Sequence, residues 1–285
     1  MLNRLYMLPL LLVLCFLLVT VPSCGMLKHD RTPEEVFSLA LSGIAGKEAL
    51  MFEGQVGLRR ENNGMFENQF KFEGKLADHD RLTLQTRLPG AVTAAGSGIN
   101  KNAVKNQGQP SGFSATYERK QGQWSALTPQ HEPLRGSLSR FNPIDQLEKI
   151  DSMKKTIQAE YGSGRQTRIL RIEIAPEEAK NWAASQLSDE MSAIRAEYQN
   201  KANRVKGANK EKLEQELYKV WQQGEDTMQQ LIQKAQVQTV YHLTVDRKTS
   251  LPMRLSSESQ VKYTDNNSQS KVEALVIDVN FKSYQ

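Results

Sequence analysis

The chain has 285 residues, and its 37 Lys and Arg against 32 Asp and Glu give a formal net charge of +5. Because the two signs are interspersed and form no concentrated basic face, the composition argues against nucleic acid as a partner. Both cysteines, Cys15 and Cys24, lie near the N-terminus, so the rest of the chain has no thiol for a disulfide, a metal ion or a nucleophile. Stability must come from a hydrophobic core, and the chain is long enough for one large domain or two small ones.

The N-terminal residues are typical of a bacterial lipoprotein signal peptide. An uncharged apolar run over residues 8–21 follows Arg4. At about 14 residues it is shorter than the roughly 20 that span a bilayer, and it fits the core of a signal peptide. The small Ser23 then precedes Cys24, which resembles a lipobox, although the two residues before Ser23 depart from the usual pattern. We expect a signal peptide over 1–23 and lipidation of Cys24; a plain secretion signal or an uncleaved anchor is the alternative.

This prediction places the protein on the extracytoplasmic face of a bacterial cell membrane, held by N-terminal acyl chains. Residues 24–31 are expected to form a short tether, and 32–285 a single domain. Thr32-Pro33-Glu34-Glu35 has the pattern of a capping box with proline at the first helical position, and apolar residues follow at helical spacing. A helix over about 33–45 is therefore predicted.

Three strands are predicted next, because apolar and polar residues alternate around 52–58, 66–73 and 82–88. Asn63-Gly64 is a hairpin signal between the first two strands. The alternation gives these strands one aromatic and apolar face, which has to be buried against either the protein's own helices or a lipid tail. The candidate ligand-lining residues are Phe52, Val56, Phe66, Phe70 and Phe72.

The middle of the chain predicts a loop over 89–111, a hairpin turning at 120–122, a helix starting at Asn142-Pro143 and a further hairpin over 156–174. Residues 176–236 predict a helical hairpin that breaks at 207–209. Its tip is basic, and we expect it either to contact anionic lipid or wall polymer or to be an ordinary solvated helix end. The basic residues are Lys201, Arg204, Lys206, Lys210 and Lys212.

No pattern typical of catalysis is present: the sequence lacks Gly-x-Ser-x-Gly, His-Glu-x-x-His, a P-loop and any Cys/His cluster. Asp78-His79-Asp80 is the one tight acid and histidine group, and we interpret it as a solvated turn. We therefore expect no catalytic residue, no metal site and no cofactor.

The final residues alternate as strands over 237–281, with Pro252 at a strand start or on an edge strand. The segment Val245-Asp246-Arg247-Lys248-Thr249-Ser250-Leu251-Pro252-Met253-Arg254 resembles the late hairpin of the LolA-like superfamily of bacterial envelope proteins, which includes the LppX/LprG-type lipoproteins. The resemblance implies an α+β fold: a curved antiparallel half-barrel sheet of roughly ten strands, with helices on its concave face and 176–236 as a long helical hairpin insertion.

The concave face of that family often holds acyl chains. The expected function is therefore non-catalytic binding or carriage of a lipid or other apolar ligand by a membrane-anchored envelope lipoprotein. The alternative is an envelope interaction module that binds a protein partner, such as a sensor, an assembly factor or a spore-germination accessory, with its cavity filled by its own side chains. An apolar cleft of several hundred Å³ would favour carriage.

Overall fold

A computed structural model describes residues 31–60, 66–87, 112–127, 138–161, 164–203, 209–265 and 268–285. The chain divides into two compact units, residues 1–32 and Pro33–Gln285, and all the described helices and strands belong to the second. Several predictions lie outside the described residues: the signal peptide with Cys24, the turn at Asn63-Gly64, the loop over 89–111 and the helix break at Gly207 and Ala208. None of the described helices is both long enough and apolar enough to span a membrane.

Ten antiparallel strands form a single sheet in the order β5-β4-β3-β2-β1-β10-β9-β8-β7-β6. The strands are β1 (Leu50–Arg60), β2 (Phe66–Ala77), β3 (Arg81–Arg87), β4 (Ser114–Lys120), β5 (Gln123–Ala126), β6 (Lys155–Glu160), β7 (Thr167–Ile174), β8 (Gln236–Asp246), β9 (Pro252–Thr264) and β10 (Ser270–Tyr284). Two five-stranded meanders therefore meet where the first strand pairs with the last. The sheet is open, because β5 and β6 end the order on opposite edges.

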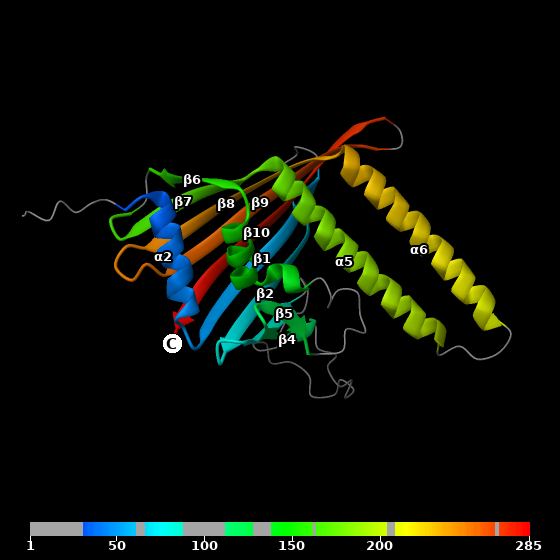
Figure 1. Ribbon diagram of the computed structural model, residues 1–285, viewed down its shortest axis with the longest axis horizontal. Coiled ribbons are helices and arrows are strands. Elements are labelled where there is room, and N and C mark those ends of the chain that lie inside the picture. The colour runs from blue at the N-terminus through cyan, green and yellow to red at the C-terminus, as the bar shows by residue number, and fades with distance from the viewer. Residues whose placement is uncertain are drawn as a thin grey trace, which may run out of the picture. The chain divides into compact units, whose positions relative to one another are not determined.

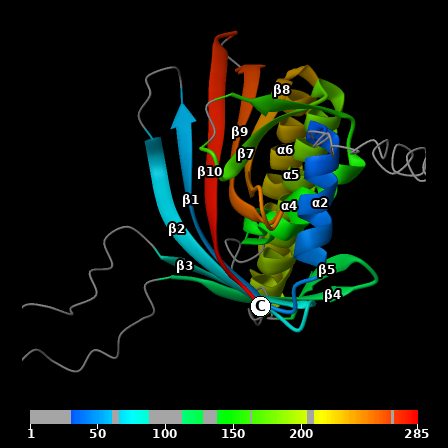
Figure 2. The same cartoon turned by 90° about the vertical axis from the view of Figure 1, so that its left-hand side faces the viewer.

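The helices lie on one face of this curved sheet (Figure 1; Figure 2). They are α2 (Pro33–Ala45), the 3₁₀ helix η3 (Leu138–Phe141), α4 (Pro143–Ser152), α5 (Pro176–Asn203) and α6 (Asn209–Lys234). The expected α+β half-barrel with helices on its concave face is thus confirmed. The helix predicted over 33–45 and the helical hairpin are also present.

The segment that contains η3 and α4 connects the two edges of the sheet. It leaves β5 at one edge and enters β6 at the other, so it crosses the concave face. The predicted cap is present: the Asn142 side chain accepts a hydrogen bond from the Ile144 amide at 3.1 Å, and Pro143 occupies the first turn of α4. Ile144, Leu147 and Ile150 then lie on the buried side of α4, against the sheet.

Two glycines let aromatic rings cover neighbouring strands in the centre of the sheet. Gly54 pairs with Phe72, and Gly74 pairs with Phe52. A Cβ atom at Gly54 would lie 2.3 Å from the Phe72 ring, and one at Gly74 would lie 2.1 Å from the Phe52 ring. Each phenylalanine therefore occupies the space above the glycine opposite it, which fixes the register of β1 and β2.

Pro252 is the first residue of β9, which confirms the predicted strand start. The alternative of an edge strand is wrong, because β9 lies inside the sheet between β10 and β8. Proline has no backbone N–H to donate to a neighbouring strand, and this is tolerated here because Pro252 stands at the turn where the strand begins.

Candidate apolar cleft beneath helix α5

The structure buries most of the predicted ligand-lining residues in the protein's own core. Phe52, Val56 and Phe72 are 2%, 3% and 3% exposed, and Phe70 is half-buried. The ring of Phe141 in η3 lies 5.2 Å from that of Phe70 and 5.4 Å from that of Phe72, centroid to centroid. Phe281 from β10 lies 6.4 Å from Phe52. The aromatic face of β1 and β2 is therefore covered by side chains of the chain itself.

Phe66 lies on the opposite face of the sheet from Phe70 and Phe72, which corrects the prediction that these side chains share one face. Phe70 pairs with Val56, but Phe66 pairs with Arg59, three residues further along β1. Paired residues of antiparallel strands point to the same face of the sheet, and neighbours along one strand point to alternate faces. Val56 and Arg59 are three residues apart, so they point to opposite faces, and Phe66 lies with Arg59 on the convex face. The cause is a bulge between Val56 and Leu58. Phe66 is 42% exposed there and covers Gly57.

A separate cleft of about 170 Å³ lies between α5 and the concave surfaces of β1, β8, β9 and β10. Its walls are mainly apolar, and its polar groups lie on the strands, on the η3–α4 segment and, at Gln186, on α5. The residues that line it are Leu58, Arg140, Gln146, Ala179, Trp182, Ala183, Gln186, Leu187, Val237, Thr239, Tyr241, Ser257, Ser259, Val261, Glu273, Leu275 and Ile277.

The α5 wall of the cleft combines two small residues with one large one. Ala179 and Ala183 keep this part of the helix thin, while the Trp182 ring stacks on that of Tyr241 at 6.3 Å and 27°. The indole Nε1 of Trp182 is buried and has no hydrogen-bond partner among the described residues. A buried N–H without an acceptor costs stability, and this atom is closed to solvent, so the open surface of the cleft does not include it.

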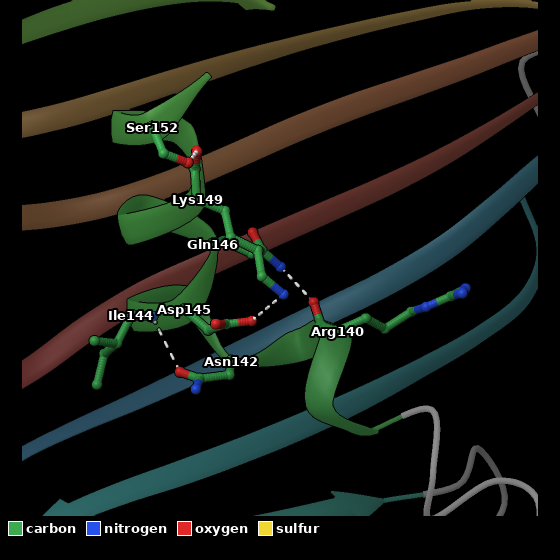
Figure 3. Close-up of polar contacts among 7 residues, drawn as sticks. All are labelled: Arg140, Asn142, Ile144, Asp145, Gln146, Lys149 and Ser152. Atoms are coloured by element: carbon green, nitrogen blue, oxygen red, sulfur yellow. Dashed lines mark hydrogen bonds and ion pairs between the residues drawn. The ribbon is translucent and has the colours of Figure 1, made fainter. Parts of the chain in front are cut away.

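The η3–α4 segment contributes two polar side chains to the lining of the cleft, Arg140 and Gln146, and Figure 3 shows their place in the polar contacts of this segment. The Gln146 side-chain amide donates a hydrogen bond to the Arg140 carbonyl, which links α4 to η3. The Arg140 guanidinium forms an ion pair with Glu190 of α5 at 2.5 Å, and both side chains are more than two-thirds buried. This ion pair connects the helix that covers the cleft to the segment that crosses the sheet.

The ionisable groups of the cleft all have partners or are held in one protonation state. Glu273 accepts a hydrogen bond from the Tyr263 hydroxyl at 3.1 Å and pairs with Arg60 at 3.2 Å. Burial raises the pKa of Tyr241 far above its ordinary value, so its phenol stays protonated at neutral pH. Within the described part of the chain, no group of three His, Cys, Asp or Glu side chains is placed to hold a metal ion. The arrangement is suited to holding an apolar group.

Asp78-His79-Asp80 forms the exposed turn between β2 and β3, as predicted. Asp78 and His79 both have positive φ, 55° and 62°, and the His79 amide donates to the Glu48 carbonyl at 3.1 Å. A short polar residue tolerates this backbone conformation, which explains Asp78 by turn geometry alone.

The basic tip of the helical hairpin falls mostly outside the described residues. Lys212 is exposed on α6. Arg204 and Lys206 belong to the undescribed segment between the helices, and the side chains of Lys201 and Lys210 are not described either. Contact between this tip and an anionic surface therefore stays a prediction.

The residues of the cleft on α5 were not among the predicted ligand-lining residues, all of which lie on the first two strands. Ala179, Trp182, Ala183, Gln186 and Leu187 follow the i, i+3, i+4, i+7, i+8 spacing of one helical face. That spacing could have identified the face of α5 that packs on the sheet. The strands opposite it could not have been found in this way, because their pairing is not local.

No protein-family model and no curated protein matches the sequence. Among solved structures, a lipovitellin structure described for its lipid–protein interactions is similar over 83% of this chain, with 7% identity and a TM-score of 0.38; the match spans 25% of that much longer chain. A LolA superfamily protein from Nitrosomonas europaea matches 89% of this chain and 95% of its own, with 8% identity and a TM-score of 0.24. An outer-membrane lipoprotein-sorting protein domain from Vibrio parahaemolyticus matches 89% of this chain and 92% of its own, with 7% identity and a TM-score of 0.26. These similarities concern the fold alone, and no functional argument rests on them.

Proposed function

We propose that the protein binds a lipid or another apolar ligand in the cleft beneath α5 and catalyses no reaction. The observation that carries this proposal is the mainly apolar cleft between the concave face and α5. An acyl chain would fill this cleft and contact its apolar walls. The resemblance of residues 245–254 to the late hairpin of LolA-like proteins implies the same class of ligand.

The cleft is smaller than the several hundred Å³ that would favour carriage, so the proposal requires α5 to move when a ligand enters. Ligand sites usually enclose about 300–1,000 Å³, and this cleft has about 170 Å³. Near its middle α5 is held by the Arg140–Glu190 ion pair, and near its N-terminal end the Lys180 ammonium donates to the Gln233 carbonyl of α6 at 2.7 Å. Outward movement of α5 would enlarge the cleft without disturbing the strands, which pair only with one another.

Mass spectrometry of organic extracts from the purified protein tests this proposal. The parent should retain a co-purifying lipid or apolar compound in a defined stoichiometry. Ala183→Phe places a ring in the cleft and should reduce that retention, whereas Ala196→Phe adds the same ring to an exposed position of the same helix and should leave it unchanged. Equal retention by the two variants, or none by the parent, would exclude the cleft as the binding site.

The membrane attachment is part of the same proposal. We propose that the protein is an envelope lipoprotein whose Cys24 carries acyl chains, because Cys24 follows a short apolar run and a small residue. Cys24→Ala should block lipidation and release the protein from the membrane fraction. Unchanged membrane fractionation of this variant would contradict lipidation at Cys24.

An envelope interaction module is the second candidate, and one observation favours it. The aromatic face of β1 and β2, which has the composition of a lipid-binding wall, is filled by Phe141 and Phe281. A protein partner would then be recognised by the outer surface. Absence of any extracted ligand together with a stable, folded parent would support this candidate over lipid carriage.

A further inference from the structure

A groove of about 380 Å³ lies between α5 and α6. It involves a part of α5 that is nearer the C-terminus than the part lining the cleft. The cleft takes its α5 residues from 179–187, and this groove takes them from 195–203. The residues that line the groove are Arg195, Tyr198, Gln199, Ala202, Asn203, Glu214, Leu217, Tyr218 and Trp221. Its volume lies within the range of about 300–1,000 Å³ that is usual for small-molecule sites.

One guanidinium group lies over two aromatic rings in this groove. The Arg195 Cζ atom is 4.5 Å from the centroid of the Trp221 ring and 5.5 Å from that of Tyr218. The two rings are 6.1 Å apart and tilted by 33°. Stacking engages the flat face of a guanidinium and leaves its edge, which carries the N–H donors, for planar anions such as carboxylate and phosphate.

The Arg195 donors are not all satisfied within the protein. Its Nε is buried and has no hydrogen-bond partner among the described residues. Glu190, which lies five residues earlier on α5, is engaged by Arg140. Glu214 and Tyr198 also line the groove. The buried Nε is closed to solvent, so an anion in the groove would meet the terminal nitrogens of the guanidinium, which form charge-assisted hydrogen bonds with carboxylate and phosphate.

The aromatic wall is fixed in position before any ligand binds. The Trp221 Nε1 donates to the Met191 carbonyl of α5 at 3.0 Å, so the ring is locked across the pair of helices. Tyr198 and Tyr218 are 43% and 49% exposed, so both rings are accessible to a molecule in the groove. Leu217 and Ala202 complete an apolar surface beside the cation.

We propose that this groove binds an amphipathic anion, an aliphatic chain that ends in a carboxylate or a phosphate group. Arg195 contacts the anionic end, and Leu217, Tyr218 and Tyr198 contact the chain. The site is independent of the cleft beneath α5, and it holds even if that cleft binds nothing.

Fluorine NMR of the full chain, labelled with 5-fluorotryptophan and kept in an uncharged detergent, tests the proposal. The chain has three tryptophans, and they report on different places: Trp221 on the groove, Trp182 on the cleft and Trp124 on β5. Tryptophan-to-phenylalanine variants assign the three signals. Octanoate and octyl phosphate should shift the Trp221 signal in a saturable manner, while octanol, acetate and inorganic phosphate, which lack either the charge or the chain, should shift it much less. A stronger response to octanoate assigns the carboxylate as the preferred end, and a stronger response to octyl phosphate assigns the phosphate.

Two variants and one control decide whether Arg195 is responsible. Arg195→Gln should weaken binding of octanoate and octyl phosphate at least about tenfold. Lys219→Gln removes the same charge from an exposed position of α6 outside the groove and should have no effect. Gln199→Phe places a ring in the groove and adds no tryptophan signal, so it should abolish the Trp221 response even if Arg195→Gln disturbs the helices.

Three results would overturn the proposal: no saturable shift of Trp221 in the parent, binding of octanol as tight as that of octanoate and octyl phosphate, or unchanged binding in Gln199→Phe. The stacked Arg195 would then be a contact between helices only. A shift of Trp182 without a shift of Trp221 would place the ligand in the cleft, so the two sites can fail separately.

Discussion

Replacing Phe72 by alanine tests whether the aromatic face of β1 and β2 is part of the folded core or the wall of a ligand cavity. Phe72 is 3% exposed, its ring lies 6.4 Å from Phe52 and 5.4 Å from Phe141, and it covers Gly54. Removing a fully packed phenylalanine leaves a hole that a sheet held on both sides cannot close. The expected loss in the free energy of unfolding is therefore about 3–5 kcal/mol.

Phe66→Ala is the matched control, because it makes the same substitution in the same strand on the opposite face. Phe66 is 42% exposed and contacts Gly57. Since its burial is incomplete and no core cavity opens, its loss should cost only about 1 kcal/mol. Urea unfolding of the two variants, followed by circular dichroism, gives both values if the denaturant slope is unchanged.

The two costs together decide the assignment of the faces. A large cost for Phe72→Ala and a small one for Phe66→Ala is expected from the bulge in β2. Equal costs would refute the register-based placement of Phe66. A cost near zero for Phe72→Ala, combined with loss of a co-purifying lipid, would show that this face is a cavity wall and that Phe141 does not fill it in solution.

Three further predictions concern α5, the late hairpin and the basic tip. Arg140→Gln removes the ion pair with Glu190 and should cost about 1.5–3 kcal/mol, because both side chains are more than two-thirds buried. Amide hydrogen exchange in α5 should become faster than in the parent while exchange in the strands stays the same; unchanged exchange in α5 would exclude the pair as the restraint on this helix. The amide and hydroxyl of Thr249 and the amide of Lys248 donate to the Asp246 carboxylate and lower its pKa, so the ionised form stabilises the fold above the unfolded-state pKa of about 3.9 and this contribution is lost as the pH falls through the lower folded value. Asp246→Asn should therefore flatten the acid side of the stability–pH curve, and a curve that matches the parent's would contradict this role. The protein should sediment with anionic and not with neutral vesicles at low salt, and should lose this binding when four basic residues of the tip are changed to glutamine; equal sedimentation of the variant would identify the tip as ordinary solvated surface. The four residues are Lys201, Arg204, Lys206 and Lys210.

Patterns of neighbouring residues in the sequence were enough to predict most helices and strands of this protein and many of their first and last residues. Asn142-Pro143 specified the start of α4 because the cap acts within the first turn of its own helix. The alternation in β8 predicted which side is buried, and Val237, Thr239, Tyr241, Leu243 and Val245 are indeed the buried residues of that strand. These signals are contained in a few neighbouring residues, so they can be read without knowledge of the fold.

Only the tertiary structure determined which strands pair, which face Phe66 occupies and where the cleft forms. The pairing of β1 with β10 joins residues more than two hundred positions apart, and no local pattern selects that partner. The bulge that turns Phe66 outward depends on how β2 matches β1 around Gly57, and one extra residue reverses the face of every side chain beyond it. The cleft exists only because α5 lies over strands β8 to β10 with two alanines facing them. Helical periodicity marks that face of α5, but the surface opposite it is set by the register of the whole sheet.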